Sequence, residues 1–202
     1  MDNKIEILKR YLPEKAVKPV YDLILKHQFQ LVITRHRKGK LGDFRPPLNG
    51  KPARITLNYT MNPYNFLLTF LHELAHYLTW IKHKRRAAPH GDEWKNELRK
   101  LQEPFLTTDY FPDDILDHLS SENQRIYASS SSDVMLARTM KNYDKGQKGV
   151  LVESLAENAI FRTADGRRFQ KLQKRRKNFF CLCLDNQRGY VFNPIAEVYP
   201  ED

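Results

Sequence analysis

Cysteine is scarce in this sequence: Cys181 and Cys183 are the only two among 202 residues. Two cysteines exclude the disulfide framework of a small secreted domain, and they cannot by themselves supply a four-cysteine zinc ribbon. Residues two positions apart on a strand point to the same face. We therefore expect two free thiols on one side of a strand, in a reducing compartment.

Long hydrophobic runs are also missing. The longest dense apolar stretch, residues 66–71, is too short to cross a bilayer. The N-terminal segment MDNKIEILKRYLPEK is charged throughout and lacks the apolar core of a signal peptide. These absences predict a cytoplasmic protein that does not contact a membrane.

Negative charge is in deficit, with 34 Lys and Arg against 24 Asp and Glu and a formal net charge of +10. Such an excess indicates an acidic partner, of which nucleic acid is the most common. The alternative is a basic, soluble surface that has no ligand.

Regular apolar spacing predicts both helices and strands. Helices are expected over residues 2–12, about 17–27, 63–84 and from about 92. Strands are expected over residues 31–34, 54–59, 159–162, 179–184 and 190–192. The helix from residue 63 has the clearest pattern, because Asn62-Pro63 is a typical helix start and apolar residues follow at three- and four-residue steps.

That helix contains the sequence HELAH at residues 72–76. His72 and His76 are one turn apart on one face, so both imidazoles can reach one zinc ion. Glu73 is placed to take a proton from a water molecule that zinc has acidified. Alternatively, two histidines lie by chance on an amphipathic helix.

A peptidase zinc also needs a third protein ligand and one open position. His90 is the leading candidate, because a loop that reverses the chain after the helix can return it to the metal. Glu93, Glu97 and His83 are the alternatives, although His83 lies about 16 Å along the helix axis from His72.

These residues resemble the SprT family, the group that includes the DNA–protein-crosslink protease Spartan. The similar segments are RKGKLGDFR at residues 37–45, ITLN at 55–58 and LHELAHYLTWIKHKRRAAPHGDEWKNEL at 71–98. The last segment is the specific one, with HExxH, then His-Gly, then an aromatic residue at Trp94.

The resemblance implies an α+β fold with a minimal zincin domain, in which helices pack on a small sheet and His72, His76 and His90 bind one catalytic zinc. It also implies peptidase activity near nucleic acid. We expect the zincin domain over residues 1–128, a linker or irregular segment with a serine run over 129–149, and a small basic β-rich region over 150–202. Many SprT relatives carry a cysteine zinc ribbon in their C-terminal part, which this sequence lacks, so a second zinc is not expected.

Residues 162–177 contain eight Lys or Arg and one acid, Asp165. The candidate nucleic-acid contacts are Arg167, Arg168, Lys171, Lys174, Arg175, Arg176 and Lys177. The nearby aromatic residues Phe169, Phe179 and Phe180 favour single-stranded DNA, since rings can stack on unpaired bases. The alternative is a solvated face with the phenylalanines in the core. Two shorter basic runs occupy residues 35–40 and 82–86.

Three functions remain open on this sequence, and the third is an interaction module that uses the C-terminal β region to dock a protein partner. The first is a zinc endopeptidase that acts on nucleic-acid-associated proteins, with Glu73 as general base. Its substrate is expected to add as a strand to residues 54–59, provided that this is an edge strand and not an interior one. The second is a nucleic-acid-binding protein on the same scaffold with little or no turnover. Trp80 and Trp94 are interpreted as core residues.

Overall fold

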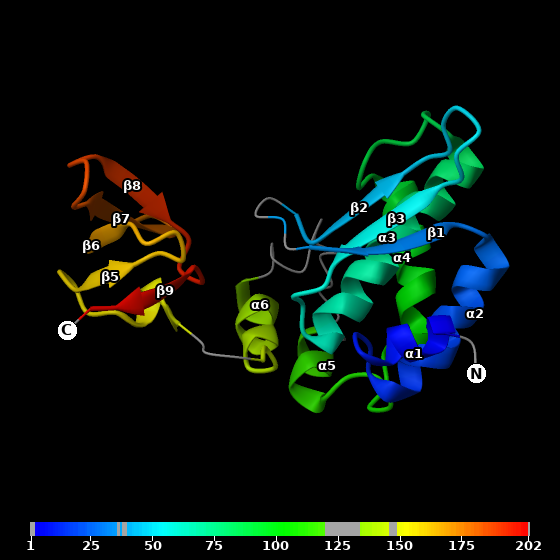
Figure 1. Ribbon diagram of the computed structural model, residues 1–202, viewed down its shortest axis with the longest axis horizontal. Helices are drawn as coiled ribbons and strands as arrows, with labels where there is room; N and C mark the ends of the chain where they lie inside the picture. Colours follow the sequence, from blue (N-terminus) through cyan, green and yellow to red (C-terminus); the bar gives the residue numbers. More distant parts are fainter. Residues whose placement is uncertain (1–2, 36, 38–39, 120–133, 146–148, 202) are drawn as a thin grey trace. The chain divides into compact units, whose positions relative to one another are not determined.

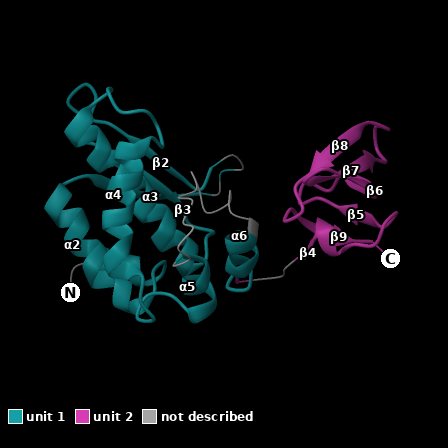
Figure 2. Cartoon of the chain, turned by 180° about the vertical axis from the view of Figure 1, so that it is seen from behind, with its two compact units in different colours: residues 1–144 teal, residues 145–202 magenta. Residues whose placement is uncertain are grey.

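The computed structural model describes residues 3–35, 37, 40–119, 134–145 and 149–201. The chain divides into two compact units (Figure 2): unit 1 is Met1–Asp144 and unit 2 is Lys145–Asp202. Each unit has its own hydrophobic core. Among the described residues, no helix combines the length and apolar character needed to cross a membrane.

Unit 1 is built mainly of helices around one sheet (Figure 1). The helices are α1 (Asn3–Lys9), α2 (Val17–His27), α3 (Pro63–His83), α4 (Asp92–Gln102), α5 (Asp113–Leu119) and α6 (Val134–Lys141). The first four lie where apolar spacing predicted them. The mixed α+β fold class is therefore confirmed.

The sheet of unit 1 has three strands, β1 (Gln30–Thr34), β2 (Gly42–Arg45) and β3 (Arg54–Asn58), in the order β1-β3-β2. β1 runs parallel to β3, and β2 runs antiparallel to it. The prediction of β3 as a possible edge strand is wrong, because β3 is paired on both sides. Within the described part of the chain, β2 is the antiparallel strand with one unpaired edge.

Helix α3 packs across one face of this sheet and carries the centre of the core. Asn62 caps the helix, since its side chain accepts a hydrogen bond from the Asn65 N–H at 2.9 Å. Pro63 follows at the first helical position, where a missing N–H costs nothing. The helix ends at His83, and Lys84 then adopts a positive φ of 54°.

The segment expected to be irregular, residues 129–149, contains helix α6. Leu136 and Met140 of α6 are buried in the core of unit 1. The Asn62 side chain holds the end of α6 by donating to the Met140 carbonyl and to Asp144, both at 2.8 Å. Tertiary packing therefore makes a helix of a short segment whose sequence pattern is weak. The serine run at 129–132 lies outside the described residues.

Unit 2 is a six-stranded antiparallel sheet in the order β4-β9-β5-β6-β7-β8. Its strands are β4 (Val150–Leu151), β5 (Ile160–Arg162), β6 (Arg168–Arg175), β7 (Asn178–Cys183), β8 (Gly189–Phe192) and β9 (Glu197–Pro200). Cys181 and Cys183 are both free and buried in the core of this unit, together with Phe161, Phe169 and Val198. Their thiols thus act as small apolar side chains.

Candidate metal centre

Three histidine side chains of unit 1 converge on one point. The Nε2 atom of His76 lies 3.1 Å from Nε2 of His72 and 3.0 Å from Nε2 of His90, and the third pair is 3.4 Å apart. Among the described residues, this is the group of three that could hold a metal ion. The three predicted ligands are therefore brought together.

The local backbone explains this convergence. His72 and His76 are one helical turn apart on α3. His90 lies in the loop that reverses the chain, and it takes a left-handed backbone conformation, with φ 58°. A non-glycine residue pays a steric cost in this region, and such residues concentrate at functional sites. Gly91 then caps α4 with an extended backbone.

The alternative ligands lie outside the cluster. Both carboxylate oxygens of Glu97 accept hydrogen bonds from the Lys82 ammonium at 2.7 Å. This pair joins α4 to the last turn of α3, so it braces the loop that carries His90. Glu97 is thus a structural residue here. Its ion pair occupies the ammonium of Lys82, which belongs to the basic run 82–86.

The three imidazoles are held in the neutral form. Burial lowers the pKa of His72 to about 3 and that of His76 to about 4, and the neighbouring imidazoles reinforce both shifts. Burial also lowers the pKa of His90. A neutral imidazole keeps the nitrogen lone pair that a metal ligand needs.

Trp94 packs against all three histidines, a role that spacing alone did not reveal. Its ring centroid lies 4.8 Å from that of His72, 5.2 Å from that of His76 and 4.6 Å from that of His90. The side chain is 1% exposed, so it belongs to the core as expected. Packing against Trp94 restricts the ring orientations that the three histidines can adopt.

Glu73 is buried beside the cluster, with 7% of its surface exposed. The strand β2 covers it: the Phe44 backbone N–H donates a hydrogen bond to the carboxylate. Burial and, secondly, the nearby charge of Asp43 raise the pKa of Glu73 to about 7. A carboxyl with such a pKa can both accept and return a proton near neutrality.

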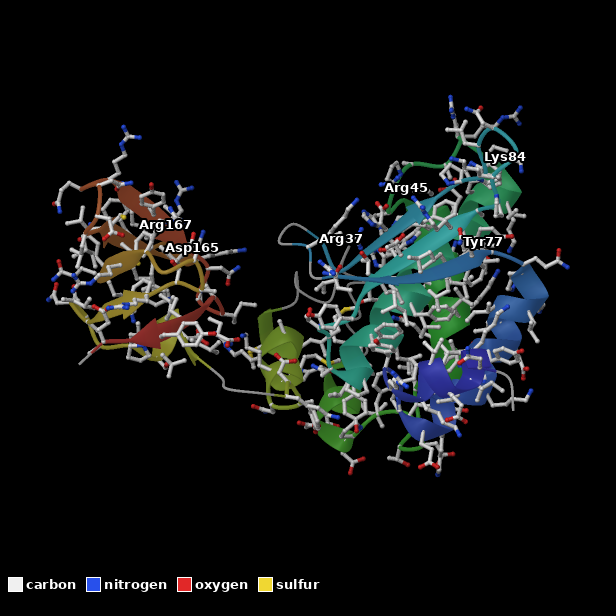
Figure 3. All side chains as sticks on the ribbon, viewed as in Figure 1. Arg37, Arg45, Tyr77, Lys84, Asp165 and Arg167 are labelled. Carbon is white, nitrogen blue, oxygen red and sulfur yellow. The ribbon has the colours of Figure 1, made fainter. Side chains whose placement is uncertain are left out.

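The predicted nucleic-acid residues of unit 2 separate into two groups. Arg167 is ion-paired with Asp165, as Figure 3 shows, and Arg168 with Glu201. Lys171 is only 5% exposed, and its ammonium donates to the backbone carbonyls of Glu153 and Leu155. The prediction of Lys171 as a nucleic-acid contact is therefore wrong, because this side chain faces the core.

The second group forms the end of the β6–β7 hairpin, and we call it the basic tip: Lys174, Arg175, Arg176 and Lys177. All four are exposed, and none forms an ion pair within the part of the chain that the structure describes. Arg175 lies over the Phe180 ring at 5.4 Å. Phe169, by contrast, is fully buried and cannot stack on a base.

The geometry defines a class, namely α+β proteins with a helix-borne histidine pair and a third histidine that together could hold a metal ion. A family model described as the SprT-like family matches residues 14–115, which is half of the chain and includes all three histidines. The chain belongs to the SprT-like family, and the family predicted from the sequence is confirmed. No curated protein and no solved structure matched the chain.

Proposed function

We propose that this protein is a zinc-dependent endopeptidase that acts on nucleic-acid-associated proteins. The observation that carries the proposal is the convergence of three neutral imidazole nitrogens beside the buried carboxyl of Glu73. Family membership supports a metallopeptidase-like fold. A purely structural zinc would take four protein ligands and would need no general base.

The residues fit zinc. Zinc–imidazole bonds of 2.0–2.1 Å in a tetrahedral arrangement place two ligand nitrogens about 3.3 Å apart. The three Nε2 separations of 3.0, 3.1 and 3.4 Å are close to this value. His72, His76 and His90 would hold the ion, and three protein ligands leave one position for water or substrate. When bound, zinc supplies Lewis acidity that acidifies a water molecule and polarises a carbonyl.

Glu73 moves the proton. With a pKa of about 7, the carboxylate takes a proton from the attacking water and returns it to the amine that leaves. Its place next to His72 on α3 and under β2 holds the carboxyl at one point of the site. The reaction is hydrolysis of a peptide bond.

The open edge of β2 offers a place for the substrate. An extended peptide can add to an unpaired strand through backbone hydrogen bonds. β2 carries Gly42 and Phe44 directly beside Glu73, so a peptide on this edge passes close to the general base. We therefore expect the substrate to add as a strand to β2 and not to β3.

The decisive experiment replaces Glu73 by Gln, which keeps the shape and removes the base. Glu73→Gln should retain about one zinc per chain and lose proteolysis of labelled casein and histone by roughly 10²- to 10⁴-fold. Glu93→Gln is the matched control, since Glu93 is exposed and outside the histidine cluster; it should leave activity unchanged.

A second function, nucleic-acid binding with little or no turnover, is favoured by the exposed basic tip. Equal activity in wild type and Glu73→Gln, or no activity with and without single-stranded DNA, would support this alternative and reject the peptidase.

A further inference from the structure

The three-stranded sheet of unit 1 has two chemically different faces. On β2, Gly42 and Phe44 point to α3: Gly42 contacts Glu73, and Phe44 packs on the Tyr77 ring at 5.8 Å. Side chains alternate along a strand, so Asp43 and Arg45 lie on the opposite face. On β3, the same face carries Arg54, because Arg45 and Arg54 are directly opposed in the antiparallel register.

Two guanidinium groups thus face the same side from neighbouring strands. Like charges directly opposite each other destabilise a sheet. Arg45 is 61% exposed and is bonded through Nε to Asp43 at 3.0 Å. Arg54 has a different environment: its Nε is buried and has no hydrogen-bond partner within the described residues. A buried donor left without an acceptor costs free energy, so the opposed guanidinium pair is unfavourable in the absence of a ligand on this face.

Two further cations are fixed on this face by a buried asparagine. The Arg37 Nε donates to Asn58 Oδ1 at 2.9 Å, and Asn58 Nδ2 donates to the Lys40 carbonyl at 2.8 Å. The Lys40 ammonium bonds Asp43 at 2.5 Å. Figure 3 shows Arg37 near the end of β1 and Arg45 on β2.

We call this surface the outer sheet face and define it by Arg37, Lys40, Asp43, Arg45 and Arg54. It carries four cations and one anion, a net charge of +3. Its length follows from β3: Asn58, which holds Arg37, lies four positions after Arg54, which is about 13 Å along a strand.

We propose that the outer sheet face binds the phosphate backbone of nucleic acid. A polyanion with one charge per 3.4 Å of strand offers about four phosphates over this length. The strand positions of this face are occupied by Gln30, Val32 and Thr34 on β1 and by Thr56 and Asn58 on β3, with no aromatic ring among them. The face therefore contacts phosphates and does not stack on bases, so duplex and single strand both bind.

This surface deepens the proposed function and rests on its nucleic-acid part. The strand β2 has Glu73 against one face and the cations on the other. Nucleic acid on the outer sheet face lies one strand away from the general base, so a protein attached to that nucleic acid is brought to the open edge of β2. Binding at this face requires no peptidase activity.

The test is a salt titration of DNA binding by the full chain, with a labelled 20-nucleotide single strand and the matching duplex. The comparison is made in a background where Arg175, Arg176 and Lys177 are Ala, so that the basic tip does not dominate. Arg45→Gln/Arg54→Gln should weaken binding of both DNAs and flatten the salt slope by about two units. The matched control, Arg10→Gln/Lys26→Gln, removes the same charge from two exposed positions, the turn after α1 and helix α2, and should leave the slope unchanged.

Stability separates a binding role from a structural one. Without DNA, the double variant should melt at the same temperature as its parent or higher, because an opposed like-charge pair has been removed. If it fails to fold, the single variant Arg45→Gln, at an exposed side chain, should still flatten the slope by about one unit. Because binding at this face requires no peptidase activity, Glu73→Gln should bind both DNAs as its parent does, so failure here and failure of the peptidase proposal are distinguishable.

Slopes equal to those of the control variant would overturn the proposal. So would a poly-glutamate peptide that binds as tightly as DNA and is equally sensitive to Arg45→Gln/Arg54→Gln, since the face would then recognise acidic protein.

Discussion

Gly42 and Glu73 lie in direct contact: a Cβ on Gly42 would come within 2.6 Å of Glu73 Oε1 and within 2.8 Å of Thr69 Cγ2. The absence of a side chain at Gly42 is what allows β2 to cover the carboxyl. That cover buries Glu73 and brings the Phe44 N–H to it, so one glycine connects the edge strand to the pKa of the proposed general base.

We expect Gly42→Ala to displace β2 or the Glu73 carboxyl. A misplacement of about 1 Å costs on the order of 10²-fold in rate, and zinc content should stay at one per chain because no ligand moves. The measurement is kcat/KM on casein together with metal analysis. Gly42→Ala/Thr69→Ser removes the methyl clash and keeps a hydroxyl for the hydrogen bond to the Asn65 carbonyl. It should recover part of the thermal stability without recovering activity, because the closer contacts of the new Cβ with Glu73 remain. Full activity in Gly42→Ala would contradict the role of this contact.

Replacing the third ligand should separate His90 from His83. His90→Ala removes one of three converging nitrogens, so zinc affinity should fall severely, whereas His83→Ala should bind zinc like wild type. Competition with a chromogenic chelator measures both affinities. Wild-type affinity in His90→Ala would reject the assignment.

The helix-borne part of the site could be predicted from the sequence because its signals are local. Asn62 and Pro63 mark the start of α3, and His72 and His76 are four residues apart, so one helix fixes both. The position of His90 depends on a loop with a left-handed residue, which spacing indicates only as one choice among several. The contacts of Trp94 with all three rings depend on how α4 packs on α3, which is a tertiary property.

Predictions made from the sequence were wrong where tertiary packing overrides a local pattern. β2 was not predicted as a strand, because Gly42, Asp43 and Arg45 give it little apolar alternation; consequently β3 was given a free edge that it does not have. Lys171 is a lysine on the core face of β6, and it is tolerated because its ammonium donates hydrogen bonds to two backbone carbonyls. Nothing in the residue type distinguishes it from the exposed Lys174.

The pKa of Glu73 predicts a stability effect in the metal-free protein. Its folded value of about 7 lies above the ordinary value of 4.5. Between these pH values the folded state binds more protons than the unfolded state, so the contribution of Glu73 is present below pH 4.5 and is lost as pH rises to 7. Glu73→Gln does not titrate. In chelator, it should therefore gain stability relative to wild type across this window, by as much as about 3 kcal/mol.

Urea unfolding at several pH values measures this difference. The three histidines have lowered pKa values, so their contribution changes in the opposite direction, weakening as pH falls below 6.5. They are present in both proteins and cancel in the comparison. A stability difference that is constant from pH 4.5 to 7 would show that Glu73 titrates normally.

The basic tip of unit 2 should bind single-stranded DNA, whereas the paired arginines of the same unit should not. Changing Arg175, Arg176 and Lys177 to Ala removes three exposed cations and should flatten the salt slope by up to about three units, because each neutralised phosphate releases counterions.

The matched control changes Arg162, Arg167 and Arg168 to Ala; these side chains pair with Asp165 and Glu201. Equal formal charge is removed, but these three arginines and their two carboxylates together carry a net charge of only +1. The tip variant should therefore lose much more affinity than the control, with zinc content unchanged in both. Equal losses would mean that net charge, and not the tip, governs binding, and equal slopes in the wild type and the tip variant would show that the tip is only a solvated surface.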